Sequence, residues 1–163
     1  GGFGRIHPGE DPDLSIRLKE MGYHLHLIPE AFVFHKRRIS LKSFYTQVNK
    51  FGQARPILNK WHPQSKRLAY WFPTVFTIGF IFSVLLVIIG FYGVLILYGL
   101  YFLVAMIGAF RTSNSINVSF LVLPAIAIQF FGYGLGFLKA TLKLGLSSKN
   151  ETSLFPNLFF RAQ

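Results

Sequence analysis

The sequence predicts an α/β segment followed by a basic amphipathic helix and about three transmembrane helices. Three observations predict this order: helix and strand patterns within residues 1–38, a run of cations without an acid over residues 36–67, and no charge over residues 68–110. Of the 163 residues, 52% are hydrophobic and only 14% are charged, against roughly 25% in soluble domains. This composition excludes a disordered chain and an ordinary soluble domain.

The first patterned stretch, residues 11–22, carries the signals of a short helix. Asp11 suits the N-cap, Pro12 suits the first helical position, and Gly22 suits the end. Residues 23–28 then alternate between polar and apolar types, and residues 31–35 form a second short run, so both are predicted as strands. Helix, strand, turn and strand are typical of a mixed α/β domain, of which residues 1–38 would be one part.

Residues 39–67 are predicted as a basic interfacial segment. Residues 41–55 have helical periodicity, Ser40 can cap their start, and Pro56 should end or kink the helix. Nine Lys/Arg and no acid lie between Lys36 and Arg67. Each cation gains about 1 kcal/mol beside an anionic leaflet, so membrane lipids, and not nucleic acid, are the expected partner. The helix would lie in the membrane interface; the alternative is a surface helix of a soluble domain.

Residues 68–138 are predicted to cross a membrane, with spans at about 72–89, 92–110 and 116–138, and residues 139–163 form a tail. About 20 residues cross the hydrocarbon core. In the third span, Gly132 and Gly136 would let another helix approach closely. One of these segments could instead be re-entrant or interfacial. The positive-inside rule places the basic segment in the cytoplasm, and the absence of charge inside the spans favours anchoring over transport.

The acidic cluster of Glu10, Asp11 and Asp13 is the first candidate for chemistry. A capped helix explains these residues without any reaction. A carboxylate that glycine-rich chain presents at a helix start can also take a proton from an attacking hydroxyl. The second candidate is His35, which precedes the cations Arg37 and Arg38. It could be a metal ligand, a phosphate contact or a surface residue, and the two arginines could hold a diphosphate.

Together these residues resemble a known family. The stretches Gly1-Gly-Phe, Gly9-Glu-Asp-Pro-Asp-Leu-Ser-Ile-Arg-Leu18, Gly22-Tyr, Pro29-Glu-Ala and His35-Lys-Arg-Arg38 follow one another in an order similar to the end of the catalytic domain of membrane-bound family 2 glycosyltransferases. The resemblance implies a GT-A fold, of which this chain would hold the C-terminal part. It implies inverting transfer from a nucleotide-sugar donor to a glycan or lipid-linked acceptor.

The resemblance also implies roles for residues. Glu10-Asp11 would be the family's acidic pair, with Asp11 as the base and Asp13 in reserve. His35 would be a ligand of a divalent metal (Mg or Mn) whose other ligands are expected upstream, together with the nucleotide-binding half. The fragment alone is therefore expected not to bind donor. The expected substrate-binding residues are Gly1, Gly2, Arg37, Arg38, Gln47, Lys50, Phe51 and Arg55.

The segment around Gln47 departs from the pattern of processive members. Their QxxRW motif has Arg and Trp where this chain has Lys50 and Phe51, and Gly52-Gln-Ala-Arg55 looks like the variant in non-processive relatives. Whether one sugar or many are added stays open. The expected location is the cell membrane, most simply the bacterial inner membrane, with the catalytic part in the cytoplasm. Two alternatives remain: a non-enzymatic anchor or assembly subunit, and a fragment of a transporter.

Overall fold

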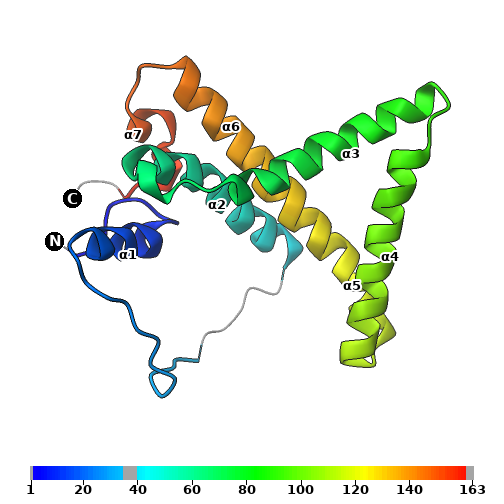
Figure 1. Cartoon of the computed structure of the whole chain (residues 1–163), viewed down its shortest axis with the longest axis horizontal. Helices are drawn as coiled ribbons and strands as arrows, with labels where there is room; N and C mark the ends of the chain where they lie inside the picture. Colours follow the sequence, from blue (N-terminus) through cyan, green and yellow to red (C-terminus); the bar gives the residue numbers. More distant parts are fainter. Residues whose placement is uncertain (1, 35–39, 161–163) are drawn as a thin grey trace.

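The structure is a computed structural model that describes residues 2–34 and 40–160, and helices dominate it (Figure 1). They are α1 (Glu10–Glu20), α2 (Leu41–Trp61), α3 (Phe72–Ile88), α4 (Gly93–Ser113), α5 (Ile116–Ala127), α6 (Tyr133–Leu146) and α7 (Glu151–Leu154). Short 3₁₀ turns occupy Pro63–Ser65, Leu68–Trp71 and Pro156–Leu158, and a π-helical turn at Ile128–Gly132 joins α5 to α6. The expected sites at Gly1, His35, Arg37 and Arg38 lie outside the described residues.

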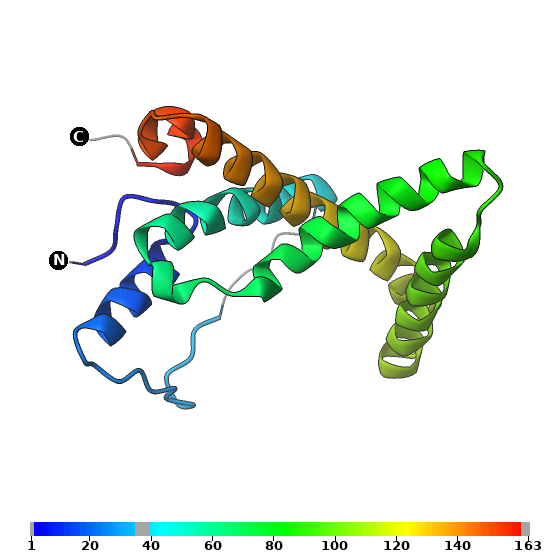
Figure 2. The same ribbon diagram turned by 45° about the horizontal axis from the view of Figure 1, so that its top comes forward.

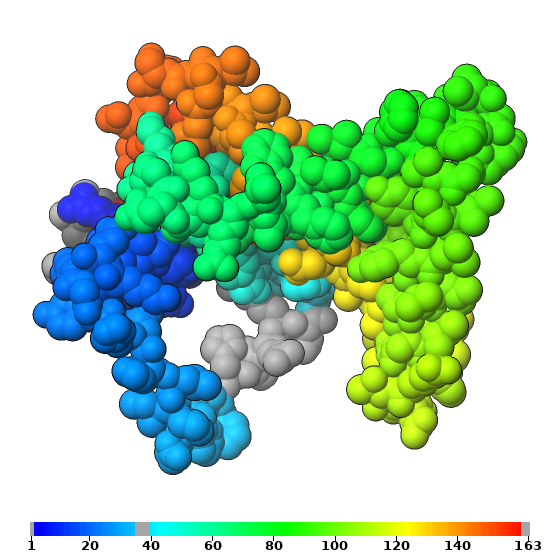
Figure 3. Space-filling model, in the orientation of Figure 1, coloured from blue at the N-terminus to red at the C-terminus, as the bar shows by residue number. Residues whose placement is uncertain are grey.

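The predicted α/β fold is wrong. The described ranges contain no strand and no sheet, and their β pairing is limited to one isolated bridge between Ile6 and Phe159. Residues 23–34 instead leave α1 as an arm that stands away from the helices (Figure 3). A strand is held by the ladder to its neighbour, and nothing described pairs with this arm. Its apolar side chains are exposed accordingly, with Leu27 at 92% and Phe34 at 97%.

The helix α1 begins earlier than the sequence predicts and ends where expected. Gly9 is its N-cap, so Asp11 is the second helical residue and not the cap. At the other end, Gly22 has a φ of 87° and donates its N–H to the carbonyl of Lys19, while the N–H of Tyr23 reaches the carbonyl of Leu18 at 3.0 Å. These two bonds form a Schellman ending, which needs the left-handed conformation that glycine adopts without strain.

The basic helix α2 confirms its predicted start and not its predicted end. The Ser40 side chain accepts the N–H of Ser43 at 3.1 Å and caps the first turn. The helix then continues through Pro56 to Trp61. A proline inside a helix costs roughly 3 kcal/mol. Pro56, Ile57 and Leu58 are all buried, and the burial of this turn offsets that cost.

Small residues bring α2 and α6 into close contact, as the pair Gly132 and Gly136 predicts. A Cβ atom at Gly132 would lie 3.3 Å from the Tyr45 ring, and one at Gly136 would overlap the backbone of Asn49. The amide of Asn49 donates to the carbonyl of Gly132 at 2.9 Å. The apolar face of α2 therefore packs largely against α6, so only part of this face is left exposed.

Three helices are long and apolar enough to span a membrane: Leu68–Ile88, Gly93–Ser113 and Ile116–Leu146. Helices occupy all three stretches predicted as spans, and the third helix is longer than expected. Gly90, with a φ of 81°, forms the turn between α3 and α4. In α4 no residue is buried, and this helix stands at the edge of the molecule in two views (Figures 1 and 2). An apolar helix with an exposed surface fits a lipid environment.

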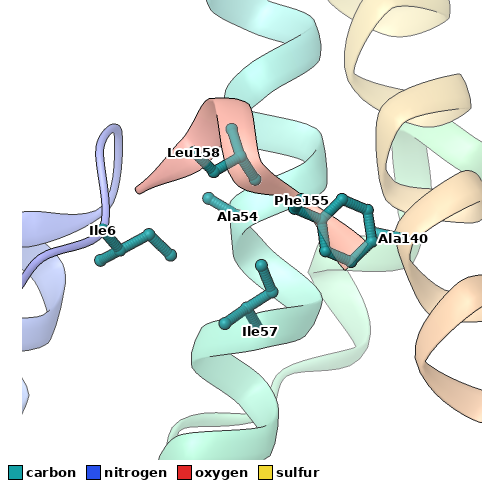
Figure 4. Close-up of a cluster of buried hydrophobic side chains, with 6 residues drawn as sticks. All are labelled: Ile6, Ala54, Ile57, Ala140, Phe155 and Leu158. Atoms are coloured by element: carbon teal, nitrogen blue, oxygen red, sulfur yellow. The ribbon is translucent and has the colours of Figure 1, made fainter. Parts of the chain in front are cut away.

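The stretch that the sequence predicts as a tail returns to the start of the chain. Phe155 and Leu158 pack against Ile6, and the cluster is completed by Ala54 and Ile57 of α2 and Ala140 of α6 (Figure 4). The backbone of His7 donates to Leu158 at 2.7 Å, and that of Phe160 donates to Arg5 at 2.9 Å. The main core thus joins both ends of the described chain to α2 and α6.

Candidate functional site

The acidic pair lies at the N-terminus of α1, where two carboxylates have different surroundings. Glu10 is partly buried, and its Oε1 lies 2.7 Å from Nδ1 of His7. Burial opposes ionisation of Glu10, but hydrogen bonds from its own backbone amide and from His7 outweigh burial and lower its pKa. Asp11 is exposed and makes no hydrogen bond to a residue that the structure describes. Its carboxylate is therefore the one available to an incoming group.

Asp13 has a third environment. It is only 6% exposed, its Oδ2 accepts from Arg17 at 3.0 Å, and its Oδ1 lies 2.8 Å from Nε2 of His62. A Cβ atom on Gly4 would lie 2.8 Å from the same carboxylate, so a glycine is needed there. Because His62 follows the end of α2, these contacts fasten α1 to α2. Sequence reasoning missed His62, since nothing in its local spacing relates it to an acid 49 positions earlier.

A pocket of about 570 Å³ lies between the start of α1 and the middle of α2. Gly9 and Pro12 form its wall on the side of the acidic pair, and Gln47, Phe51 and Arg55 form the wall on α2. Three of the four expected substrate-binding residues of α2 thus share one cavity with the neighbours of Asp11. The fourth, Lys50, is partly exposed and is not part of the wall.

Apart from α1 and α2, the wall of this pocket comes from the apolar segments Leu68–Ile88 and Ile116–Leu146. It consists of Ala69, Tyr70, Pro73, Gln129 and Tyr133. The guanidinium of Arg55 lies 4.2 Å from the centre of the Tyr70 ring, a cation–π contact that holds the arginine at the cavity. Tyr70 and Tyr133 were not among the site residues predicted from the sequence. Such a cavity, apolar with a few polar groups, is the usual form of a small-molecule site.

Comparison with known proteins identifies the family of this chain. A family model described as "Glycosyl transferase family group 2" matches residues 1–131, which include the acidic pair, α2 and the apolar helices α3, α4 and α5. The chain belongs to this glycosyltransferase family. No curated protein and no solved structure matches it.

The acidic and histidine side chains near the pocket are engaged with one another. Over residues 2–34 and 40–160, no group of three or more His, Asp or Glu side chains is placed to bind an ion. Glu10 is paired with His7, and Asp13 is paired with His62 and Arg17. The described residues therefore do not form a metal site by themselves.

Proposed function

We propose that this glycosyltransferase transfers a sugar, with inversion, from a nucleotide-sugar donor to a hydroxyl of a lipid-linked or growing glycan acceptor at the membrane surface. One observation carries the proposal. Gly9 and Pro12, which flank the acidic pair at the start of α1, line one pocket together with Gln47, Phe51 and Arg55 of α2, beside the apolar helices. The acidic pair and this part of α2 are the two motifs that the resemblance to membrane-bound family 2 enzymes assigns to the base and to substrate binding.

Asp11 is the proposed base. Its exposed carboxylate accepts the proton of the acceptor hydroxyl while the hydroxyl oxygen forms a bond to the anomeric carbon of the sugar. The bond between that carbon and the nucleotide diphosphate breaks on the opposite face, and the diphosphate leaves with the electron pair. Asp11 is exposed and has no described hydrogen-bond partner. It therefore suits this role better than Glu10, which is hydrogen-bonded to His7, or Asp13, which is buried in a network of ion pairs.

Acceptor binding is assigned to the wall of α2. Gln47 supplies an amide, Arg55 supplies a guanidinium that Tyr70 supports from behind, and Phe51 supplies an aromatic face. A group held here lies beside Gly9 and Pro12, which flank the acidic pair. Holding the acceptor beside the base in this way makes an otherwise bimolecular reaction effectively unimolecular. Lys50 is partly exposed and lies outside the pocket wall, so we assign it no contact with the bound acceptor.

Donor binding is assigned chiefly to residues outside the described ranges. Arg37 and Arg38 have the chemistry to hold a diphosphate by paired N–H donors, and Gly1 and Gly2 would approach the nucleotide closely. If a divalent metal (Mg or Mn) takes part, His35 would be one ligand and the others would come from upstream. We place the catalytic part on the cytoplasmic face of a cell membrane, in bacteria the inner membrane.

The test is a comparison of carboxylate variants of the full-length protein in native membranes. The probes are UDP-glucose, UDP-N-acetylglucosamine and GDP-mannose, and the readout is release of nucleoside diphosphate. Asp11→Asn should abolish release with the best donor while leaving donor binding within twofold. Glu30→Gln, the same kind of change on the exposed arm, is the matched control and should retain activity. Full activity of Asp11→Asn would refute Asp11 as the base and move that role to Asp13. Failure of the unaltered protein to release nucleoside diphosphate from any of the three donors would favour a non-enzymatic anchor.

A further inference from the structure

A second pocket, of about 420 Å³, shares Pro12, Arg55 and Tyr70 with the first. Three cations line it: Lys19 from the end of α1, Arg55 from α2, and Arg67 from the segment that precedes the first apolar helix. We call it the cationic pocket. Glu20 is the acid among its lining residues, and the carboxylate of Glu20 is already engaged by His62 and Gln64.

The three cations have no anionic partner among the residues that the structure describes. The ion pairs found there involve other basic groups, namely Arg17, Lys60, His7 and His62. Arg55 is held by the Tyr70 ring, and a stacked guanidinium keeps its N–H donors in the plane of the group. Three cations that line one pocket and pair with no described acid are complementary to a phosphate group.

The position of the cationic pocket indicates where this phosphate comes from. Arg67 directly precedes the apolar stretch Leu68–Ile88, and Tyr70 and Trp71 lie in the first turn of that stretch. Aromatic residues of this type lie at the level of lipid headgroups, so the pocket is placed at that level. The first pocket, which adjoins it, has apolar walls from Phe44, Val48 and Phe51. A ligand with a charged head and an apolar chain can therefore occupy both.

From this geometry we infer that the cationic pocket binds the phosphate group of a membrane amphiphile. Two sources share this chemistry: the phosphodiester of a bilayer phospholipid and the phosphate of a single-chain or polyprenyl-type monoester. The inference depends on the charges and on the membrane boundary, and it stands whether or not Asp11 is the catalytic base.

The experiment uses the full-length protein in phosphatidylcholine nanodiscs, with hexadecyl phosphate as the probe and native mass spectrometry to count adducts. Arg67→Gln and Lys19→Gln should each weaken binding about tenfold, the order of magnitude of one charge-assisted hydrogen bond. Lys66→Gln is the matched control: Lys66 is exposed, adjacent to Arg67, and absent from the cationic pocket. It should change binding less than twofold. Helix content and the melting temperature verify that each variant is folded.

The remaining arms distinguish the sources. Competition by phosphatidylglycerol indicates a bilayer phosphodiester, whereas binding that phosphatidylglycerol leaves unchanged indicates a monoester; either result supports the inference. Inorganic phosphate should bind at least tenfold more weakly than hexadecyl phosphate. Equal binding of inorganic phosphate would overturn the assignment to an amphiphile. Equal losses in Arg67→Gln and Lys66→Gln, or no loss in Arg67→Gln and Lys19→Gln, would reduce the effect to general attraction between a basic protein and anions.

Discussion

The close approach of α2 and α6 at Gly52 makes a quantitative prediction for Gly52→Ala. A Cβ atom there would lie 3.0 Å from the backbone nitrogen of Phe137 and closer still to the carbonyl oxygen of Tyr133. Both atoms belong to helix backbone and cannot rotate away. Relief of this overlap requires the two helices to separate by roughly 1 Å, because overpacked atoms displace the backbone around them.

The cost of that separation can be estimated from the contacts it affects. Overpacking costs about 1–3 kcal/mol, and the shift also weakens the hydrogen bond from Asn49 to Gly132, worth about 1 kcal/mol. We expect the free energy of unfolding to fall by about 2–4 kcal/mol, which for a chain of this length lowers the melting temperature by roughly 5–15 °C. Circular dichroism of the purified protein in nanodiscs measures this shift.

A matched control exists within the same chain. Gly99 lies in the middle of α4, and a Cβ atom there meets nothing within 4 Å. Gly99→Ala should leave the melting temperature unchanged or raise it slightly, since alanine is the better helix former by up to about 1 kcal/mol. If Gly52→Ala has the same melting temperature as Gly99→Ala, then α2 does not pack against α6 as described, and the pocket between α1, α2 and the apolar helices is not formed in this way.

Three further predictions concern the contacts around the site. Asp13→Asn should lower the free energy of unfolding by about 3 kcal/mol in urea titrations, because it leaves His62 and Arg17 beside an uncharged group in a buried network; Glu30→Gln is the control. Leu158→Ala, which empties a fully buried site, should cost about 2–5 kcal/mol in the same assay. The third concerns pH. The hydrogen bond from Lys60 lowers the pKa of Glu151, so the pair stabilises the folded state above the ordinary glutamate pKa, and this contribution disappears as the pH falls from about 5 through the lowered pKa. Since Lys60 is 57% exposed, the loss should be at most about 1 kcal/mol, and Glu151→Gln should abolish it in melting curves between pH 3 and pH 7. Unchanged stability in any of these variants would contradict the contact that it tests.

Features that depend on local chemistry were predictable from the sequence. Ser40 caps α2 through a bond within its own first turn, and Gly22 ends α1 because only its left-handed backbone closes that turn. The apolar helices also follow from composition alone, because a membrane requires long uncharged segments whatever they pack against. The same holds for the family, whose motif residues lie close together in the chain.

Features that depend on distant partners were not predictable. Residues 23–28 alternate like a strand, yet alternation does not supply the neighbour that a strand requires, and the described structure leaves them without regular secondary structure and exposed. Pro56 should end a helix by local rules, and it fails to do so because Pro56 and the next two residues, Ile57 and Leu58, are all buried. The contact between Asp13 and His62 has no local signal at all.

The pairing of residues 5–7 with residues 158–160 has a consequence for membrane topology. Two segments that exchange backbone hydrogen bonds must lie on the same face of the bilayer. The chain between them therefore has to cross an even number of times, although it contains three apolar helices of sufficient length. We expect two complete crossings and one helix that enters and leaves on the same face. Because residues 1–163 contain no cysteine, Lys19→Cys and Lys149→Cys can be compared directly in this chain, and a thiol reagent applied to one face should label both or neither.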